Sequence, residues 1–523
     1  MASINSVASD LINAVNFAPQ TQTSKEGDSL KISNVASTLA VIYEAARNSV
    51  EFRSEHLIRQ AAIARILKRR LFLGQSGGKL ALLLVKELLW ARYLRENFIT
   101  RGKVDEIERI INKYKVAIES AKEGDDYTEW LWGIAACEIE ENLAFNPYPQ
   151  ILINFVTQTL QGRIELTGEE DAKTKDIQIY IAVERAFAKN SEVFIGYHLI
   201  KAMLPQWIRA TGADFSKLHS QLFARYEEIV RQLRYPLAFE VKKEVGKLTP
   251  PFNLIRELIN RYPEEFLHAV TNENEFEALS RQVLSGLYGE VQTKLLRAST
   301  RSIIYIFLTK MVFGLALELP FDSFIGKTNY SALIINTLFP PALMFLFNFG
   351  IQIPDEKNTQ RIWEKVREYF YEKNVSAVIE IEKKPKAQGG LQKIFLVIYA
   401  ILFVGVFGLI IWFLNTLDFS IVSQLIFLFF LCVVSFFAFK VRRISKEYVY
   451  EEGKEGVFTS LMDFLFLPFI KVGQWISIQI TYLNVLTFIF DFIIEAPLKA
   501  FLEVTEEWIH FIRLKKEEIF TQG

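Results

Sequence analysis

Residues 394–439 read IFLVIYAILFVGVFGLIIWFLNTLDFSIVSQLIFLFFLCVVSFFAF and contain a single charged residue, Asp418. A helix rises 1.5 Å per residue, so each half of this segment is long enough to cross a hydrocarbon layer about 30 Å thick. Asn415 and Thr416 precede Asp418 and favour a turn at that point. The segment therefore predicts two spans, residues 394–417 and 419–439, joined in a transmembrane hairpin.

Two further apolar stretches lie upstream and predict a first hairpin. Residues 331–353 carry no charge, and residues 303–319, IIYIFLTKMVFGLALEL, carry only Lys310 and Glu318 before Pro320. Asn336, Pro340, Pro341 and Asn348 lie inside the later stretch, and the double proline predicts an interrupted helix there. With the hairpin at 394–439, the sequence predicts four spans.

Basic residues beside spans are retained in the cytoplasm, and they set the expected orientation. They concentrate in residues 294–301, 354–393 and 440–446, whereas the loop 320–330 holds only Lys327. The first residues, MASINSVASDLINAVNFAPQ, lack the basic start and apolar run of a signal peptide. We expect a multi-pass protein of the cytoplasmic (inner) membrane with both termini in the cytoplasm. Anionic lipid headgroups are the expected partners of Lys383, Lys384, Lys386, Arg442 and Arg443.

The C-terminal segment is predicted to lie in the membrane interface. Residues 472–490 are uncharged, but a fifth crossing would place Arg513, Lys515 and Lys516 outside. Polar residues recur at three, four or seven positions and form one stripe along a helix. The stripe consists of Asn484, Asp491, Glu495, Lys499, Glu503, Glu506, His510, Arg513 and Glu517. A re-entrant pair, 457–470 and 472–490, is the open alternative.

Apolar residues at helical spacing fill the first half of the chain and predict an all-α cytoplasmic domain. The expected helices cover 35–73, 79–98, 104–122, 127–144, 149–161, 174–189, 192–209, 214–233, 251–270 and 274–298. The only candidate strand is VSAVIEIE at 375–382. The predicted organisation is a disordered tail (1–32), a cytoplasmic helical domain (33–298), a first transmembrane hairpin (299–353), a cytoplasmic linker (354–393), a second hairpin (394–440) and an amphipathic or re-entrant C-terminal membrane segment (441–523).

Composition and motifs exclude several classes of function. Half of the 523 residues are hydrophobic, and 60 basic residues balance 60 acidic ones, which argues against a nucleic-acid partner. Two distant cysteines, Cys137 and Cys432, form no metal-binding motif, and HExxH, GxSxG and GxGxxG are absent. GQSGGK at 74–79 lacks the spacing and preceding strand of a phosphate loop, so we interpret it as a break between helices. We expect no enzyme activity, and no catalytic, cofactor-binding or metal-binding residue is assigned.

The unusual residues are polar groups among apolar neighbours, which need a partner, water or a position at the membrane edge. They are Lys310, Glu318, Asn336, Asp463, Lys471, Asp491 and Glu495. Snorkelling towards the cytoplasmic side is the favoured explanation for Lys310, and an ion pair with Asp463, Asp491 or Glu318 is the alternative. Glu318 is expected about 12 Å from Lys310 along one helix, so pairing between them is expected to need another element.

Several stretches resemble one family of proteins. These are EAARNSVEFRSEHLIRQAAIARILKRRL at 44–71, RSIIYIFLTKMVFGLALELPFD at 301–322, LMDFLFLPFIKVGQWIS at 461–477 and FDFIIEAPLKAFLEVTEEW at 490–508. They are similar to uncharacterised multi-span inner-membrane proteins of candidate-phyla bacteria with reduced genomes. The resemblance implies an inner-membrane location and carries no activity, cofactor or catalytic residue.

Three hypotheses for function follow from the sequence. The first is a membrane-anchored interaction or scaffold protein of the cell envelope, whose cytoplasmic domain binds protein partners or a second copy. The second is a channel or transporter for ions or small solutes that uses the polar residues of the first two spans. An intramembrane enzyme is the third.

Overall fold

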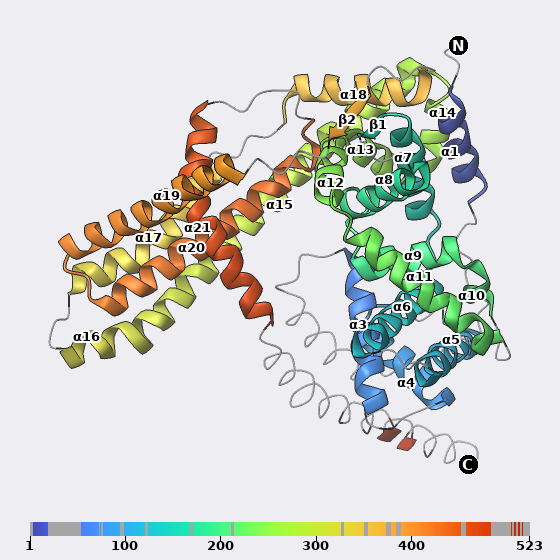
Figure 1. The fold of residues 1–523 in the computed structure, drawn as a ribbon, viewed down its shortest axis with the longest axis horizontal. Coiled ribbons are helices and arrows are strands. Elements are labelled where there is room, and N and C mark those ends of the chain that lie inside the picture. The colour runs from blue at the N-terminus through green and yellow to red at the C-terminus, as the bar shows by residue number, and fades with distance from the viewer. Residues whose placement is uncertain are drawn as a thin grey trace. The chain divides into compact units, whose positions relative to one another are not determined.

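The computed structural model describes residues 4–18, 54–72, 74, 77–94, 99–120, 124–167, 171–210, 214–325, 329–349, 354–372, 378–382, 389–450 and 457–482, together with 501, 504, 507, 508, 511, 512 and 515. Within these ranges the fold is all-α, as the sequence predicts (Figure 1). Two short strands, β1 (Ile164–Thr167) and β2 (Ile379–Glu382), pair in a two-stranded sheet. The candidate strand at 375–382 is thus confirmed at its end, and β1 is a strand that the sequence did not reveal.

The chain divides into two compact units, which are described separately. Unit 1 comprises residues 1–9, 166–168 and 247–483, and unit 2 comprises residues 10–165, 169–246 and 484–523. Residues 247–298 therefore group with the apolar helices that follow them. The sequence had placed them in the cytoplasmic helical domain, 33–298.

Unit 2 is a bundle of helices whose starts follow local capping chemistry. Its helices are α3 (Glu55–Phe72), α4 (Gly77–Trp90), α5 (Arg101–Ser120), α6 (Asp125–Leu143), α7 (Tyr148–Gln161), α8 (Ala172–Ala186), α9 (Glu192–Met203), α10 (Pro205–Arg209), α11 (Phe215–Leu233) and α12 (Ala238–Lys247). The Asp171 carboxylate accepts hydrogen bonds from the backbone amides at the start of α8, and the Ser191 hydroxyl does the same for α9. Gly74 follows α3 with a positive φ of 73°, so GQSGGK begins just after one helix and contains the start of the next.

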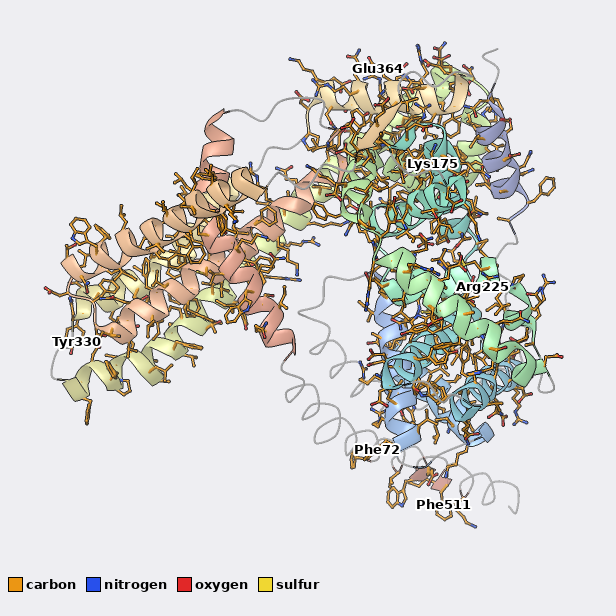
Figure 2. All side chains as sticks on the ribbon, in the orientation of Figure 1. Phe72, Lys175, Arg225, Tyr330, Glu364 and Phe511 are labelled. Atoms are coloured by element: carbon orange, nitrogen blue, oxygen red, sulfur yellow. The ribbon has the colours of Figure 1, made fainter. Side chains whose placement is uncertain are left out.

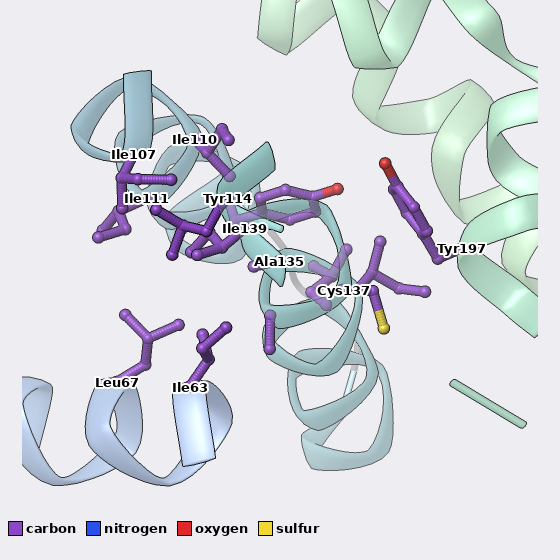
Figure 3. Close-up of a cluster of buried hydrophobic side chains, with 14 of the residues drawn as sticks. Ile63, Leu67, Ile107, Ile110, Ile111, Tyr114, Ala135, Cys137, Ile139 and Tyr197 are labelled. Atoms are coloured by element: carbon purple, nitrogen blue, oxygen red, sulfur yellow. The ribbon is translucent and has the colours of Figure 1, made fainter. Parts of the chain in front are cut away.

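The core of unit 2 is aliphatic and is formed by side chains from several helices (Figure 3). Ile63 and Leu67 of α3 are buried with Ile107 and Ile111 of α5. Helix α6 packs on α3, α5 and α9. Close contact of α6 with α9 depends on Gly133, where a Cβ atom would lie 2.8 Å from a methyl of Val193. Burial of such side chains, about 1.5–3 kcal/mol each, stabilises unit 2.

Unit 1 begins with helices that pack around aromatic side chains. These are α13 (Thr249–Arg261), α14 (Pro263–Ala269), the start of α15 (Glu273–Phe313) and α18 (Glu356–Tyr371). Phe252 stacks on Tyr369 with ring centroids 4.7 Å apart, and Phe276 contacts Trp363 and Phe370. Residues 356–371, which the sequence placed in a cytoplasmic linker over 354–393, therefore form a packed helix. Apolar residues Ile362, Val366 and Phe370 at four-residue spacing explain the burial.

The rest of unit 1 consists of long apolar helices that lie side by side (Figure 1). Helix α15 continues through a π-helix, η3 (Gly314–Glu318), into α16 (Leu319–Ile325), and is followed by α17 (Tyr330–Phe349), α19 (Gly389–Thr416), α20 (Ile421–Ser445), a 3-10 turn, η4 (Lys446–Tyr448), and α21 (Val457–Tyr482). Among the described residues, three helices are long and apolar enough to cross a membrane: Glu273–Phe324, Leu396–Thr416 and Ile421–Arg442. Tyr330–Leu346 is a shorter apolar helix. Length and composition thus indicate membrane association. Exposed apolar side chains cover these helices (Figure 2).

Two of these helices continue through prolines. Helix α17 is continuous over Pro340 and Pro341, although the sequence predicted an interrupted span. Helix α21 is continuous over Pro468 and Gly473, so the break expected between 470 and 472 in a re-entrant pair is absent. Neighbouring helices α20 and α19 pack on α21, and such packing tolerates the lost backbone hydrogen bonds.

A short N-terminal helix replaces part of the predicted disordered tail. Helix α1 covers Ser6–Asn16 within the expected tail, 1–32. Ala8, Leu11 and Val15 are buried at helical spacing, and the Asn5 side chain accepts a hydrogen bond from the amide of Ala8. The Asn5 amide group also donates to the carbonyl of Tyr369, 2.8 Å away. Burial and capping thus fix residues whose composition indicated disorder.

Candidate functional site

The candidate site lies between apolar helices of unit 1 and is built around Glu318. The π-helix Gly314–Glu318 inserts one extra residue between Lys310 and Glu318. In a regular α-helix, residues eight apart differ by about 80° around the axis, and one extra residue reduces this to about 20°. The π-helix therefore turns the two side chains to one face of the same helix.

Lys310 and Glu318 form an ion pair, with 3.4 Å between Nζ and Oε2. The expectation that pairing needed another element was wrong. It used only the rise along the helix axis and left out the length of the two side chains and the effect of the π-helix. Lys310 also lies over the ring of Phe430, with Nζ 5.3 Å from its centroid. Both charged side chains have no exposed surface, so in the structure Lys310 is directed into the helix bundle. The sequence had favoured snorkelling.

The second oxygen of Glu318 accepts hydrogen bonds from two other helices. Oε1 lies 2.6 Å from the Asn336 side-chain nitrogen of α17 and 2.6 Å from the Ser423 hydroxyl of α20. The same Asn336 nitrogen donates to the backbone carbonyl of Ser423, 3.1 Å away. Ser423 lies in the first turn of α20, where the helix dipole favours a carboxylate. One carboxylate thus connects three helices, and its charge is compensated without solvent.

Within the described part of the chain, two buried oxygens of this region have no hydrogen-bond partner. They are Oδ1 of Asn336 and Oδ1 of Asp322, in side chains that are at most 5% exposed. Gly314 lies close by, since a Cβ atom there would be 4.0 Å from Oε2 of Glu318. It also lines an apolar groove of about 350 Å³ with Met311, Leu315 and Leu333. An unpartnered buried oxygen costs free energy, which marks this region as more than apolar packing.

Of the remaining polar residues predicted for the membrane segments, Lys471 alone has a described side chain, and it does not join the cluster. Lys471 is exposed on α21, and Asp463 is a helical residue of α21. Asp491 and Glu495 lie outside the described residues, as do Lys383, Lys384 and Lys386. Arg442 is half-buried near the end of α20, and Arg443 is in the same helix.

Sequence reasoning missed a second buried carboxylate, Glu184 of α8 in unit 2. It accepts hydrogen bonds from His198 Nδ1 at 2.7 Å, from the Tyr180 hydroxyl at 2.7 Å and from the Asn190 side-chain amide at 2.5 Å. Burial raises the pKa of Glu184, but these hydrogen bonds outweigh it and lower the pKa. The His198 side chain is 13% exposed, whereas that of Glu184 is completely buried.

The Glu184 network extends to α3 and lies near a second titratable pair. His56 Nε2 lies 2.7 Å from Asn190 Oδ1, and burial lowers the pKa of His56. Arg59, one turn further along α3, pairs with Glu140 of α6 at 2.9 Å. Burial raises the pKa of Glu140 to about 7, although Arg59 opposes the shift. No local motif links these residues, because they come from α3, α6, α8 and the segment between α8 and α9, which meet only in the fold.

The described residues contain no group of three or more His, Cys, Asp or Glu side chains that could hold a metal ion. No protein-family model, curated protein or solved structure matches this chain. Any conclusion on function therefore depends on the geometry of these sites and surfaces.

Proposed function

We propose that the protein is a membrane-anchored interaction protein, with unit 2 as the binding module and the apolar helices of unit 1 as the anchor. The observation that supports this most directly is a hollow of about 530 Å³ at the end of α11. It is lined by Tyr226, Val230, Arg231, Arg234, Tyr235 and neighbouring residues. Tyrosine and arginine are enriched where proteins bind one another.

The two arginines of the hollow are available to a partner. Both are exposed, and in the described part of the chain neither guanidinium forms an ion pair or a hydrogen bond. By contrast, Arg225 of the same helix pairs with Glu228 at 2.6 Å. Tyr226 is held from behind by Tyr127 and Trp130, so it presents a rigid aromatic surface.

The closed cluster around Glu318 supports an anchor better than a route for solutes. Its charged side chains have no exposed surface, and both carboxylate oxygens are already bound by Lys310, Asn336 and Ser423. Polar contacts between apolar helices fix which faces meet. The resulting arrangement is four spans, α15 with its extension, α17, α19 and α20, in the inner membrane with both termini in the cytoplasm.

Site-specific photo-crosslinking in native membranes tests the interaction. A crosslinking amino acid at Glu227, which lines the hollow, should form an adduct of defined mass, identified by mass spectrometry. Arg231→Ala should weaken it, whereas Arg225→Ala should not. A crosslinker at exposed Glu129 of α6 is the control position. No adduct from Glu227, together with a purified chain that remains monomeric, would contradict the proposal.

Cysteine labelling tests the topology. Single cysteines at Thr328, Gln388 and Thr521, in a chain lacking Cys137 and Cys432, are treated with a membrane-impermeant thiol reagent on cells without an outer barrier. Only the cysteine at 328 should react. Reaction at 521 would show an odd number of crossings, and reaction at 388 would invert the orientation.

The unpartnered oxygens of Asn336 and Asp322 favour a second candidate function, an ion or small-solute pathway. Buried oxygens without donors suit a cation or water. Vesicles containing the purified protein should then show a flux that Lys310→Ala changes and that Lys471→Ala, on the exposed face of α21, leaves unchanged. Equal flux in protein-free vesicles would exclude this pathway.

A further inference from the structure

The described residues near the C-terminus form an exposed apolar stripe. Residues 501, 504, 507, 508, 511, 512 and 515 are all helical and exposed. Five of them are large and apolar, with exposed fractions of 40–68%: Phe501, Val504, Trp508, Phe511 and Ile512. At 100° per residue these five occupy an arc of about 100° on one side of a helix.

A helical projection of the sequence places polar residues opposite the stripe. At 100° per residue, Glu503, Glu506, His510 and Arg513 fall about 140–220° from Trp508. At the end of the stripe, Lys515 lies over the ring of Phe511, with Nζ 6.0 Å from the centroid. A lysine in this position extends its charge away from an apolar surface that its stem helps to cover.

We infer that this stripe binds the surface of the lipid bilayer, with its apolar side chains below the headgroups. The inference rests on the membrane location in the proposed function and not on any protein partner. Helices of unit 1 hold the chain at a membrane, so a second, weaker membrane contact gains from high local concentration. Trp and Phe are typical of helices that lie in the membrane interface.

A second copy of the chain is the competing occupant. Residues 501, 504, 508 and 511 are separated by three, four and three positions, which also fits a coiled coil. However, coiled coils prefer Ile, Val and Leu at these positions, and the pattern extends over about two heptads where three to four are needed. Aromatic residues and the short length therefore favour lipid.

The charge of the segment predicts how binding responds to lipid composition. Residues 499–518 contain four basic and five acidic residues. Electrostatic attraction to anionic headgroups is therefore small, and apolar burial provides the binding free energy. The depth of the stripe should not change with salt or with the fraction of anionic lipid.

Spin labels on the full chain in lipid nanodiscs test this inference. A nitroxide replaces Trp508 or, as the matched control, Glu506, in a chain lacking Cys137 and Cys432. Nanodiscs of phosphatidylcholine are compared with nanodiscs that also contain phosphatidylglycerol. The label at 508 should collide with oxygen and be shielded from a water-soluble nickel chelate, at a depth of about 5–10 Å, and the label at 506 should show the reverse.

The alternative outcomes are distinct. Exposure of the label at 508 to the nickel chelate, or shielding from both reagents, would overturn the inference. Short distances between labels at 508 on two chains in one nanodisc would assign the stripe to self-association. Failure of the full chain to enter nanodiscs would instead refute the membrane location in the proposed function. Trp508→Glu with Phe511→Glu should release a label at Val504 into water while the chain remains inserted.

Discussion

Glu318 of unit 1 and Glu184 of unit 2 are both completely buried carboxylates, yet different chemistry stabilises each of them. Glu318 is paired with Lys310, which also has no exposed surface, and with the neutral donors Asn336 and Ser423. Glu184 is paired with His198, whose side chain is partly exposed, and with Tyr180 and Asn190. The carboxylate among the apolar helices thus has a lysine as its partner, whereas the carboxylate of the helical bundle has a histidine.

The largest expected effect comes from removing the counter-charge of Glu318. Lys310→Met leaves a buried carboxylate without compensation, and we expect a loss of about 3–5 kcal/mol in the free energy of unfolding. Adding Glu318→Gln removes the charge and retains an oxygen for Asn336 and Ser423, so K310M/E318Q should recover most of that loss. Equilibrium unfolding in mixed micelles measures both. Equal destabilisation by the single and double variants would show that the uncompensated charge of Glu318 does not cause the loss of stability.

The next largest effect is expected at the contact between α20 and α21, which does not depend on charge. A Cβ atom at Gly473 would lie 2.1 Å from the carbonyl oxygen of Cys432, and a backbone atom yields less than a flexible side chain. Gly473→Ala should therefore lower the free energy of unfolding by about 1–3 kcal/mol. Gly405→Ala in α19 is the control, because nothing in the described structure lies within 4 Å of its added carbon. If both variants unfold alike, the tight contact is absent.

The stability of unit 2 is expected to depend on pH through Glu140. The pKa of Glu140 is about 7 in the folded protein and 4.5 in the unfolded chain, because burial outweighs the attraction of Arg59. The folded state therefore binds more protons between pH 4.5 and 7, and this stabilisation is complete below 4.5 and is lost as the pH rises through 7. Relative to Glu140→Gln, the native protein should lose about 2 kcal/mol across this window.

Thiol labelling of buried Cys137 measures this effect in a chain carrying Cys432→Ser. Cys137 lies in α6 with Glu140, so its reaction reports the opening of unit 2. The ratio of labelling rates between two variants at one pH cancels the titration of the thiol itself. Glu129→Gln, at an exposed position of the same helix, should give a constant ratio from pH 5 to 8. A constant ratio for Glu140→Gln as well would refute the shifted pKa.

Secondary structure was predictable from sequence because it depends on local patterns. The helices expected at 149–161, 174–189 and 214–233 correspond to α7, α8 and α11, whereas the helix expected at 192–209 is divided at Pro205 into α9 and α10. Local patterns missed α12 and the division of 251–270 at Pro263 into α13 and α14. Contacts with distant residues decide such elements, and α18 shows this most clearly, since α13 and α15 cover its apolar face.

The candidate site was only partly predictable. Lys310, Glu318 and Asn336 were recognised because charged and amide groups are rare in apolar stretches. Ser423 was missed, because a serine in an apolar helix gives no such signal. The π-helix was missed too, and with it the pairing of Lys310 with Glu318. Glu184 of α8 and His198 of α9 are fourteen residues apart, and the fold brings the Glu184 carboxylate to 2.7 Å from His198 Nδ1.

The smallest expected effect concerns another lysine–glutamate pair. Lys68 Nζ lies 2.6 Å from Glu129 Oε1, closer than Lys310 lies to Glu318, but these side chains are 52% and 72% exposed. Water already stabilises both charges, so Lys68→Ala should change the opening of unit 2 by less than about 0.5 kcal/mol, and added salt should abolish the difference. Cys137 labelling at low and high salt measures it. A loss comparable to that of Lys310→Met would mean that distance, rather than solvent exposure, determines the contribution of an ion pair in this protein.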